Sequence, residues 1–293
     1  MMKFLELAVF AAGILTALMV VSPASAKGEE QPGAYEVREN VEFTSGPEPQ
    51  KLDAHIPPGK GPFPAVILVH GGGWVTGTKT AEFIRPLFPV LDQTGFAWFS
   101  IDYRLAPAHP YTDMVEDVES AIQYVKDHAR QFKVNPKKIA LMGESAGAHL
   151  VNLVGARNRK PMDVAAVVSF YGPIDLLRFF HFNGPDNHLT PHLKGVFRVE
   201  KLDDAGFAVI RDASPETFLS KKTPPFLFIH GTKDEAVPYE QATLSMELFK
   251  KHGLSADLIT VQDGIHGVIN WEKDPKFQGY KTEMIEWLKR TLH

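Results

Sequence analysis

The chain has 293 residues, of which 44% are hydrophobic and 23% are charged, and its formal net charge is −4. Positive and negative side chains are interspersed without a basic stripe, which argues against nucleic acid as a partner. The chain contains no cysteine, which excludes disulfides, so the hydrophobic core has to supply the stability.

The first 26 residues have the pattern of a secretory signal peptide. Lys3 supplies a positive charge, residues 7–21 form an apolar run, and Ala24-Ser25-Ala26 matches a small-residue cleavage site. A retained membrane anchor is the alternative, but the run is shorter than the span of about 20 residues that a bilayer requires. We therefore expect export to the periplasm or the medium, a mature single domain over residues 27–293, and no stable membrane insertion after cleavage.

Beyond the signal peptide, strand-like and helix-like segments alternate. This pattern predicts an α/β fold in which a mostly parallel, doubly wound sheet of about eight strands has helices on both faces. The strands are expected to begin with an antiparallel hairpin, and they lie at residues 35–43, 51–56, 64–69, 96–101, 138–142, 165–170, 225–230 and 256–261.

Two helices have clear sequence signals. In the segment 113–131 the apolar residues recur at steps of three and four, which places one apolar face on the sheet. Thr112 or Asp113 is expected to cap the start of this helix. The segment 278–292 predicts a second helix, which should close the fold behind the loop that contains His266.

Ser145 lies between two glycines in Gly143-Glu144-Ser145-Ala146-Gly147, directly after an apolar strand and before a helix-compatible stretch. This is the strand–turn–helix context of a nucleophile elbow, in which only small residues fit two positions either side of the serine. An adjacent base would make the exposed hydroxyl a nucleophile.

A glycine-rich segment, His70-Gly71-Gly72-Gly73-Trp74, follows the strand at 64–69. It has the pattern of an oxyanion loop, whose backbone N–H groups stabilise the negative oxygen of an acyl-transfer intermediate. We assign the oxyanion hole to the amides of Gly72, Gly73 and Ala146. A phosphate cradle is the alternative, but the Lys-Ser/Thr pair of a P-loop does not follow.

With these motifs the chain resembles the α/β-hydrolase superfamily, and within it the hormone-sensitive-lipase-like carboxylesterases and the bacterial feruloyl and acetyl-xylan esterases. Residues 102–107 and 230–234 add to the resemblance, in the order that the family has. Residues 52–57 and Trp74 are more similar to the xylan-esterase branch. The resemblance implies a serine esterase that needs no metal or organic cofactor.

In that superfamily the catalytic acid follows the serine, and the histidine comes last. Asp234 lies in the loop after the strand at 225–230, and His266 lies after the strand at 256–261, so both are expected at the carboxyl edge of the sheet. Asp263 is an alternative acid, but three residues from His266 it is poorly placed to orient the ring. For His70, His149 and His230 we expect structural roles.

Residues 173–224 interrupt the alternation, after the sixth strand, and are expected to form an insertion that shapes the substrate pocket. Four phenylalanines of this segment either line an acyl pocket or belong to the core: Phe179, Phe180, Phe182 and Phe197. His188 and His192 have the spacing of a metal pair, but Pro191 would break the helix that this requires, and we expect no metal site. We expect substrate contacts from Trp74, Glu144 and Tyr171.

The sequence therefore favours an exported serine esterase that acts through an acyl-enzyme on acylated carbohydrate, such as acetyl or feruloyl esters, or on small esters. In this hypothesis His266 removes the Ser145 proton and Asp234 orients the imidazole. A serine peptidase or a lipase of the same superfamily is the alternative. A binding protein that kept the fold without the chemistry is a third hypothesis.

Overall fold

The structure is a computed structural model that describes residues 34–182 and 191–293. The predicted signal peptide, residues 1–26, lies outside the described residues, as does His188 of the insertion.

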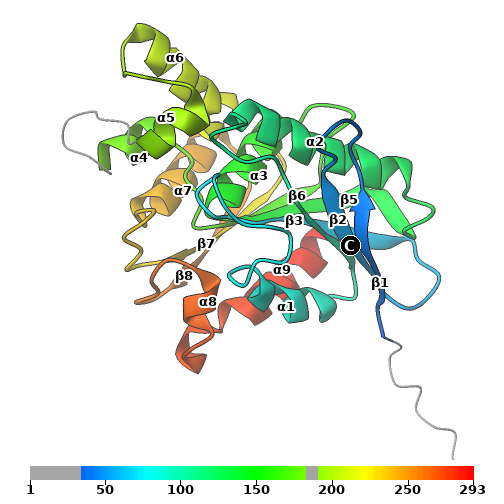
Figure 1. Ribbon diagram of the computed structural model, residues 1–293. Coiled ribbons are helices and arrows are strands. Elements are labelled where there is room, and N and C mark those ends of the chain that lie inside the picture. Colours follow the sequence, from blue (N-terminus) through cyan, green and yellow to red (C-terminus); the bar gives the residue numbers. More distant parts are fainter. Residues whose placement is uncertain (1–33, 183–190) are drawn as a thin grey trace, which may run out of the picture. The chain divides into compact units, whose positions relative to one another are not determined.

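One eight-stranded sheet forms the centre of the fold (Figure 1), with strand order β1-β2-β4-β3-β5-β6-β7-β8. β1 and β2 form an antiparallel hairpin, β2 pairs antiparallel with β4, and all later pairs are parallel. The strands are β1 (Glu36–Glu42), β2 (Lys51–Ile56), β3 (Phe63–Val69), β4 (Ala97–Ile101), β5 (Val134–Glu144), β6 (Ala166–Phe170), β7 (Phe226–Gly231) and β8 (Ala256–Val261).

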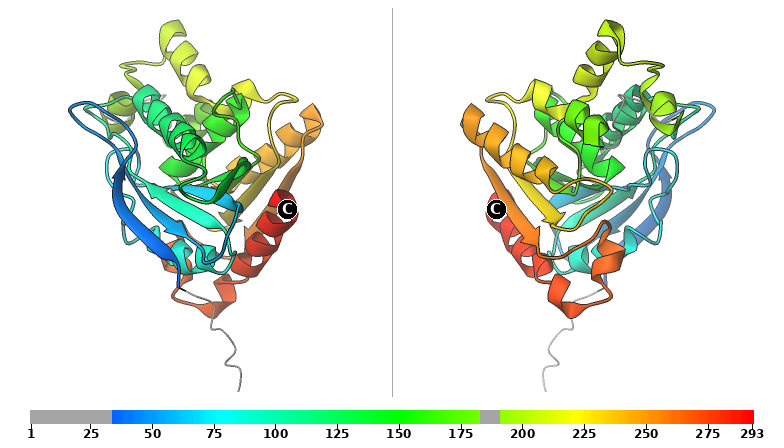
Figure 2. Two further views of the ribbon diagram at one scale, coloured as in Figure 1. Left: turned by 90° about the vertical axis from the view of Figure 1, so that its right-hand side faces the viewer. Right: turned by 90° about the vertical axis from the view of Figure 1, so that its left-hand side faces the viewer.

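Helices cover both faces of this sheet, as Figures 1 and 2 show. One face carries α2 (Tyr111–Asp127), α3 (Ala146–Arg157) and α7 (Glu240–His252), and the other carries α1 (Phe88–Asp92), α8 (Val268–Trp271) and α9 (Tyr280–Leu292). The remaining helices are α4 (Leu176–Phe182), α5 (Pro191–Phe197), α6 (Asp204–Ala213), and the 3-10 turns η1 (Arg85–Leu87), η2 (Pro215–Phe218) and η3 (Pro275–Phe277).

The side chains of β3 explain why the sheet is buried on both sides. Successive residues of a strand point to opposite faces, and a strand that is covered twice needs apolar residues throughout. Ala65, Ile67 and Val69 belong to the core under α2 and α3, whereas Val66 and Leu68 belong to the core under α1 and α9. All five side chains are fully buried.

The observed strands and helices confirm the predicted α/β fold class, although the predicted start of one helix differs from the structure. The predicted helix at 113–131 is α2, which begins at Tyr111 and has Pro110 at its N-cap without a side-chain cap. The prediction that Thr112 or Asp113 caps this helix was wrong. The Asp113 carboxylate instead forms an ion pair with Arg104 (3.6 Å) and lies 2.9 Å from Nδ1 of His109.

No helix in residues 34–182 or 191–293 is long and apolar enough to cross a membrane.

Candidate active site

Ser145 lies in a sharp turn between β5 and α3. Its backbone has φ 54° and ψ −117°, a strained conformation for a residue with a side chain. The turn is held because Ser145 N–H donates to the Phe170 carbonyl (2.9 Å) of the neighbouring strand. A Cβ on Gly147 would collide with the carbonyl oxygens of Val69 and His70, so only glycine fits there. The local sequence thus folds as the predicted nucleophile elbow.

Loops at the carboxyl ends of two further strands bring an imidazole and a carboxylate to Ser145. His266, in the loop after β8, lies with Nε2 3.0 Å from Ser145 Oγ. Its Nδ1 lies 2.7 Å from Oδ2 of Asp234, in the loop after β7. Three segments that are distant in the sequence therefore form one hydrogen-bonded line, with the base between hydroxyl and acid as acyl transfer requires.

The surroundings of Asp234 keep its carboxylate ionised. Burial alone would raise the pKa, but hydrogen bonds from His230 and His266 and the Val237 N–H hold the pKa of this carboxyl well below its usual range. Oδ1 accepts the backbone N–H groups of Ala236 (2.9 Å) and Val237 (2.8 Å), which leaves Oδ2 for the imidazole.

The alternative acid, Asp263, forms an ion pair at the surface. Its side chain is 47% exposed and pairs with Lys233 at 2.9 Å, which lowers the pKa of Asp263. The structure thus places Asp234, and not Asp263, next to His266.

The oxyanion loop follows β3, beside the elbow. Gly72 and Gly73 have φ +94° and +60°, which glycine adopts readily, and the Gly72 carbonyl accepts from Val75 and Thr76 N–H. Within the part of the chain that the structure describes, the amides of Gly72, Gly73 and Ala146 donate to no other residue. They are therefore free to bind an oxyanion.

The buried side chains of His70, Tyr103 and His149 contact this loop. His70 contacts the Gly71 carbonyl through Nδ1 (2.8 Å) and stacks on Tyr103, whose hydroxyl donates to the His70 carbonyl (3.0 Å). The indole N–H of Trp74 donates to Nδ1 of His149 (3.2 Å). These contacts agree with the structural roles predicted for His70 and His149. His230 also has a structural contact, because its Nε2 lies 2.8 Å from the Val237 carbonyl.

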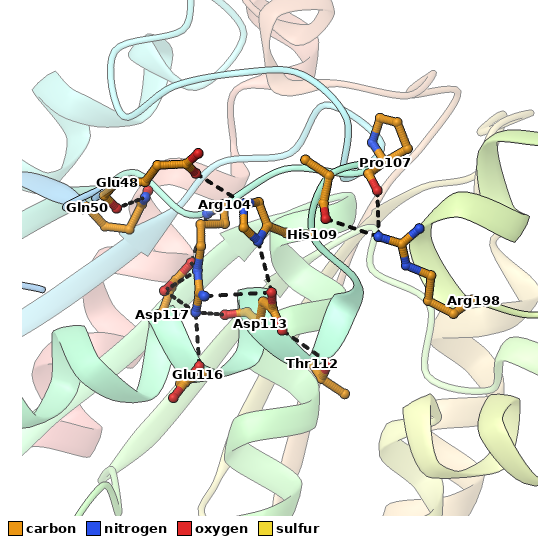
Figure 3. A network of polar contacts seen from close by, with 11 residues as sticks. Glu48, Gln50, Arg104, Pro107, His109, Thr112, Asp113, Glu116, Asp117 and Arg198 are labelled. Carbon is orange, nitrogen blue, oxygen red and sulfur yellow. Dashed lines mark hydrogen bonds and ion pairs between the residues drawn. The ribbon is translucent and has the colours of Figure 1, made fainter. Parts of the chain in front are cut away.

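A charged network holds the segment after β4 against the oxyanion loop and the insertion (Figure 3). Ala106 N–H donates to the Trp74 carbonyl (2.9 Å), and Arg104 pairs with the buried Asp117 at 2.8 Å. From the insertion, Arg198 donates to the carbonyls of Pro107 (2.7 Å) and Ala108 (3.0 Å). The network thus ties the end of α5 to the body of the protein.

A pocket of about 300 Å³ opens beside Ser145. Most of its lining is apolar, and its lining residues are Gly73, Trp74, Ser145, Ala146, Pro173, Phe179, His192, Leu193, Ala236 and Val237. Three of them, Phe179, His192 and Leu193, come from α4 and α5, within residues 173–224. Phe179, Phe180 and Phe197 all belong to the core, and of these three only Phe179 also lines the pocket.

The three predicted substrate-binding residues lie in different places. Trp74 lines the pocket, whereas Glu144 and Tyr171 are only 3% and 0% exposed and lie outside its lining. We therefore correct the prediction for Glu144 and Tyr171, whose contacts are with other residues of the site. His192 was missed as a pocket residue, because its spacing from His188 suggested a metal pair and no motif marks it.

In the described residues there is no group of three or more histidine, cysteine or acidic side chains arranged to hold a metal ion.

Comparison with known proteins identifies the family. The BD-FAE family model matches residues 52–249, which is more than half of the chain. The chain belongs to the BD-FAE family.

Curated relatives of this BD-FAE protein include two from Mycobacterium tuberculosis. The probable carboxylic ester hydrolase LipM is 33% identical over 62% of this chain and 44% of its own length, and the esterase LipC is 34% identical over 64% and 48%. The chain spans about half the length of these relatives.

Solved structures with the same fold include a truncated carbohydrate esterase from gut microbiota. It has a TM-score of 0.74 and 22% identity, and the match covers 88% of this chain and 97% of that one. An acetyl ester-xyloside bifunctional hydrolase from Caldicellulosiruptor lactoaceticus has a TM-score of 0.72 and 24% identity, over 84% and 89% of the chains. With the observed strand order, these likenesses show that the BD-FAE protein has the α/β-hydrolase fold.

Proposed function

We propose that this BD-FAE protein is a serine carboxylic-ester hydrolase that acts through an acyl-enzyme. The observation that carries the proposal is the hydrogen-bonded line from Asp234 through His266 to Ser145, which shares a pocket with Gly73 and Ala146. The esterase names of the relatives support the same reaction class.

In the proposed mechanism, His266 Nε2 takes the Ser145 proton as Oγ attacks the ester carbonyl. The amides of Gly72, Gly73 and Ala146 bind the oxyanion, and the imidazolium then donates its proton to the leaving alcohol. Asp234 holds the imidazole in the tautomer that carries a proton on Nδ1. A water activated by His266 then releases the acid from the acyl-enzyme.

We further propose that the substrates are acetyl or feruloyl esters of carbohydrate, or small esters. The pocket supports this choice, because about 300 Å³ with an apolar lining suits a compact acyl group. The two structural neighbours described above are a carbohydrate esterase and an acetyl ester-xyloside bifunctional hydrolase. The signal-peptide pattern of residues 1–26 supports export, which N-terminal sequencing of the mature protein would test.

The experiment that tests the reaction is turnover of p-nitrophenyl acetate, butyrate and octanoate, methyl ferulate and acetylated xylan by wild type and Ser145→Ala. We expect Ser145→Ala to lower kcat by roughly 10⁴- to 10⁶-fold. Ser169→Ala is the control, because Ser169 is a buried serine near the end of β6 that does not line the pocket. Preference for octanoate would favour a lipase, and cleavage of peptides without ester turnover would favour a peptidase.

A further inference from the structure

Glu144 is a buried carboxylate directly beside the nucleophile, and the mechanism above does not use it. It is the last residue of β5, and its side chain points toward the oxyanion loop, where Oε1 accepts the Gly71 N–H at 2.6 Å. This contact takes up the one amide of the glycine run that does not belong to the oxyanion hole. It also fixes the His70–Gly71 peptide plane, one residue before Gly72.

Tyr171 extends this contact to the loop that contains His266. Its backbone has φ 40°, an unusual conformation for a non-glycine residue, directly after β6. Its hydroxyl accepts the Val268 N–H (2.9 Å), and the phenol interacts with the nearby Glu144 carboxyl, whose pKa it lowers. The ring packs edge-on against the imidazole of His266, with centroids 4.6 Å apart.

A phenol hydroxyl has one proton to donate and lone pairs with which to accept, so it can serve both contacts at once. Gly71 precedes the oxyanion glycines, and Val268 lies two residues after His266. A continuous series of contacts therefore runs from Gly71 through Glu144 and Tyr171 to Val268.

We propose that Glu144 and Tyr171 are positioning residues that fix the oxyanion loop and the His266 loop relative to each other around Ser145. We call this pair the Glu144–Tyr171 bridge. The kinetic consequences of this bridge rest on the proposed function. Its structural consequence, the ordering of the two loops, is independent of that function.

The charge state of Glu144 matters to the bridge, because a carboxylate accepts from both Gly71 and Tyr171, whereas a protonated carboxyl loses acceptor capacity. Burial raises the pKa of Glu144 to about 7, against the lowering influence of His266 and of the hydrogen bonds from Gly71 and Tyr171. The titratable groups that act on this carboxyl are His266, Tyr171 and Tyr103.

Tyr171→Phe removes the bridging hydroxyl and keeps the ring on His266. With p-nitrophenyl acetate we expect kcat to fall roughly 10-fold or more, with KM changed by less than about 3-fold, because misplaced catalytic groups cost rate more than binding. Tyr280→Phe is the matched control. Tyr280 is 2% exposed, and its hydroxyl has no partner in the described part of the chain. Loss of the Tyr280 hydroxyl should leave kcat unchanged.

Glu144→Gln tests the carboxylate at nearly constant volume. The amide retains one oxygen that can accept from Gly71 but loses the negative charge. We expect a loss of kcat similar to that of Tyr171→Phe, and an acid limb of the kcat–pH profile that lacks the ionisation near 7. The double variant should lose little more than either single variant, because the two groups act as one unit.

Hydrogen exchange measured by mass spectrometry gives a readout that needs no activity. Tyr171→Phe should speed exchange in peptides covering 70–76 and 264–270, and Tyr280→Phe should do so in neither. A Tyr171→Phe variant with unchanged exchange in both loops overturns the bridge, as does one that loses thermal stability but keeps the wild-type kcat. Absence of ester turnover in the wild type refutes the proposed function, and the exchange experiment still decides on the bridge.

Discussion

The indole Nε1 of Trp74 lies 3.2 Å from Nδ1 of His149, and this contact joins the oxyanion loop to the helix behind the nucleophile. Because the indole can only donate, Nδ1 accepts and the proton of the neutral imidazole is on Nε2. Nε2 in turn lies 2.8 Å from the Ala213 carbonyl at the end of α6. One buried histidine thus connects the oxyanion loop, the elbow helix and the insertion.

Trp74→Phe should destabilise the protein by about 1–3 kcal/mol, because it leaves the buried Nδ1 of His149 without a donor. Urea unfolding followed by circular dichroism would measure this loss. We also expect a lower kcat, since Trp74 directly follows Gly73 in the oxyanion loop. An unchanged unfolding midpoint would show that the contact contributes nothing to stability.

The protein should lose stability in mild acid because of two buried histidines. Burial lowers the pKa of both His70 and His149 from 6.5 to about 4. Between these values the unfolded chain binds more protons than the folded one, so the unfolding free energy rises with pH from about 4 to 6.5.

His149→Gln should remove part of this pH dependence, which is measured as the urea midpoint at pH 5 against pH 7. The matched control is His252→Gln, because His252 is exposed at the end of α7. Equal slopes in wild type and His149→Gln would contradict the prediction.

Glu144 should have the opposite effect on stability. Its folded pKa of about 7 exceeds the ordinary 4.5, so the folded state binds the extra proton and stability falls as pH rises through this window. Each pKa unit corresponds to about 1.4 kcal/mol, so the burial of this charge costs a few kcal/mol at pH 8. Glu144→Gln should therefore raise the melting temperature at pH 8 more than at pH 5. A uniform shift at both pH values would show that Glu144 does not titrate in this range.

The sequence predicted the strands and the sharp turn at Ser145 well because both have strong local signals. The fully apolar β3 followed by three glycines, and a serine between two glycines, each require one local structure. The roles of Glu144 and Tyr171 had no such signal, because they depend on how β5 and β6 pair and on where Val268 lies. His192 likewise reaches the pocket only through the packing of α5, which no local pattern specifies.

Asp234→Asn should lower kcat by roughly 10⁴-fold, because an amide does not hold the imidazole in the tautomer that accepts the serine proton. The fold should persist, since the remaining oxygen can still accept from Ala236 and Val237. Asp263→Asn is the matched control, and it should keep nearly the wild-type rate because Asp263 pairs with Lys233 on the surface. If kcat fell by this much only in Asp263→Asn, Asp263 and not Asp234 would be the catalytic acid.

His192 should set how long an acyl or alcohol group the pocket accepts. Its ring lies against the oxyanion loop, since a Cβ placed on Gly73 would be 3.3 Å from Nε2, and it shares the pocket with Ser145. His192→Ala removes this wall, so we expect kcat/KM for p-nitrophenyl octanoate to rise several-fold relative to acetate, at roughly 1 kcal/mol per accommodated methylene. Lys194→Ala is the control on the same helix, because Lys194 pairs with the exposed Glu200 and does not line the pocket. If the ratio of kcat/KM for octanoate to that for acetate is the same in wild type and both variants, His192 does not limit chain length. The longer acyl chain would then extend from Ser145 in a direction away from α5.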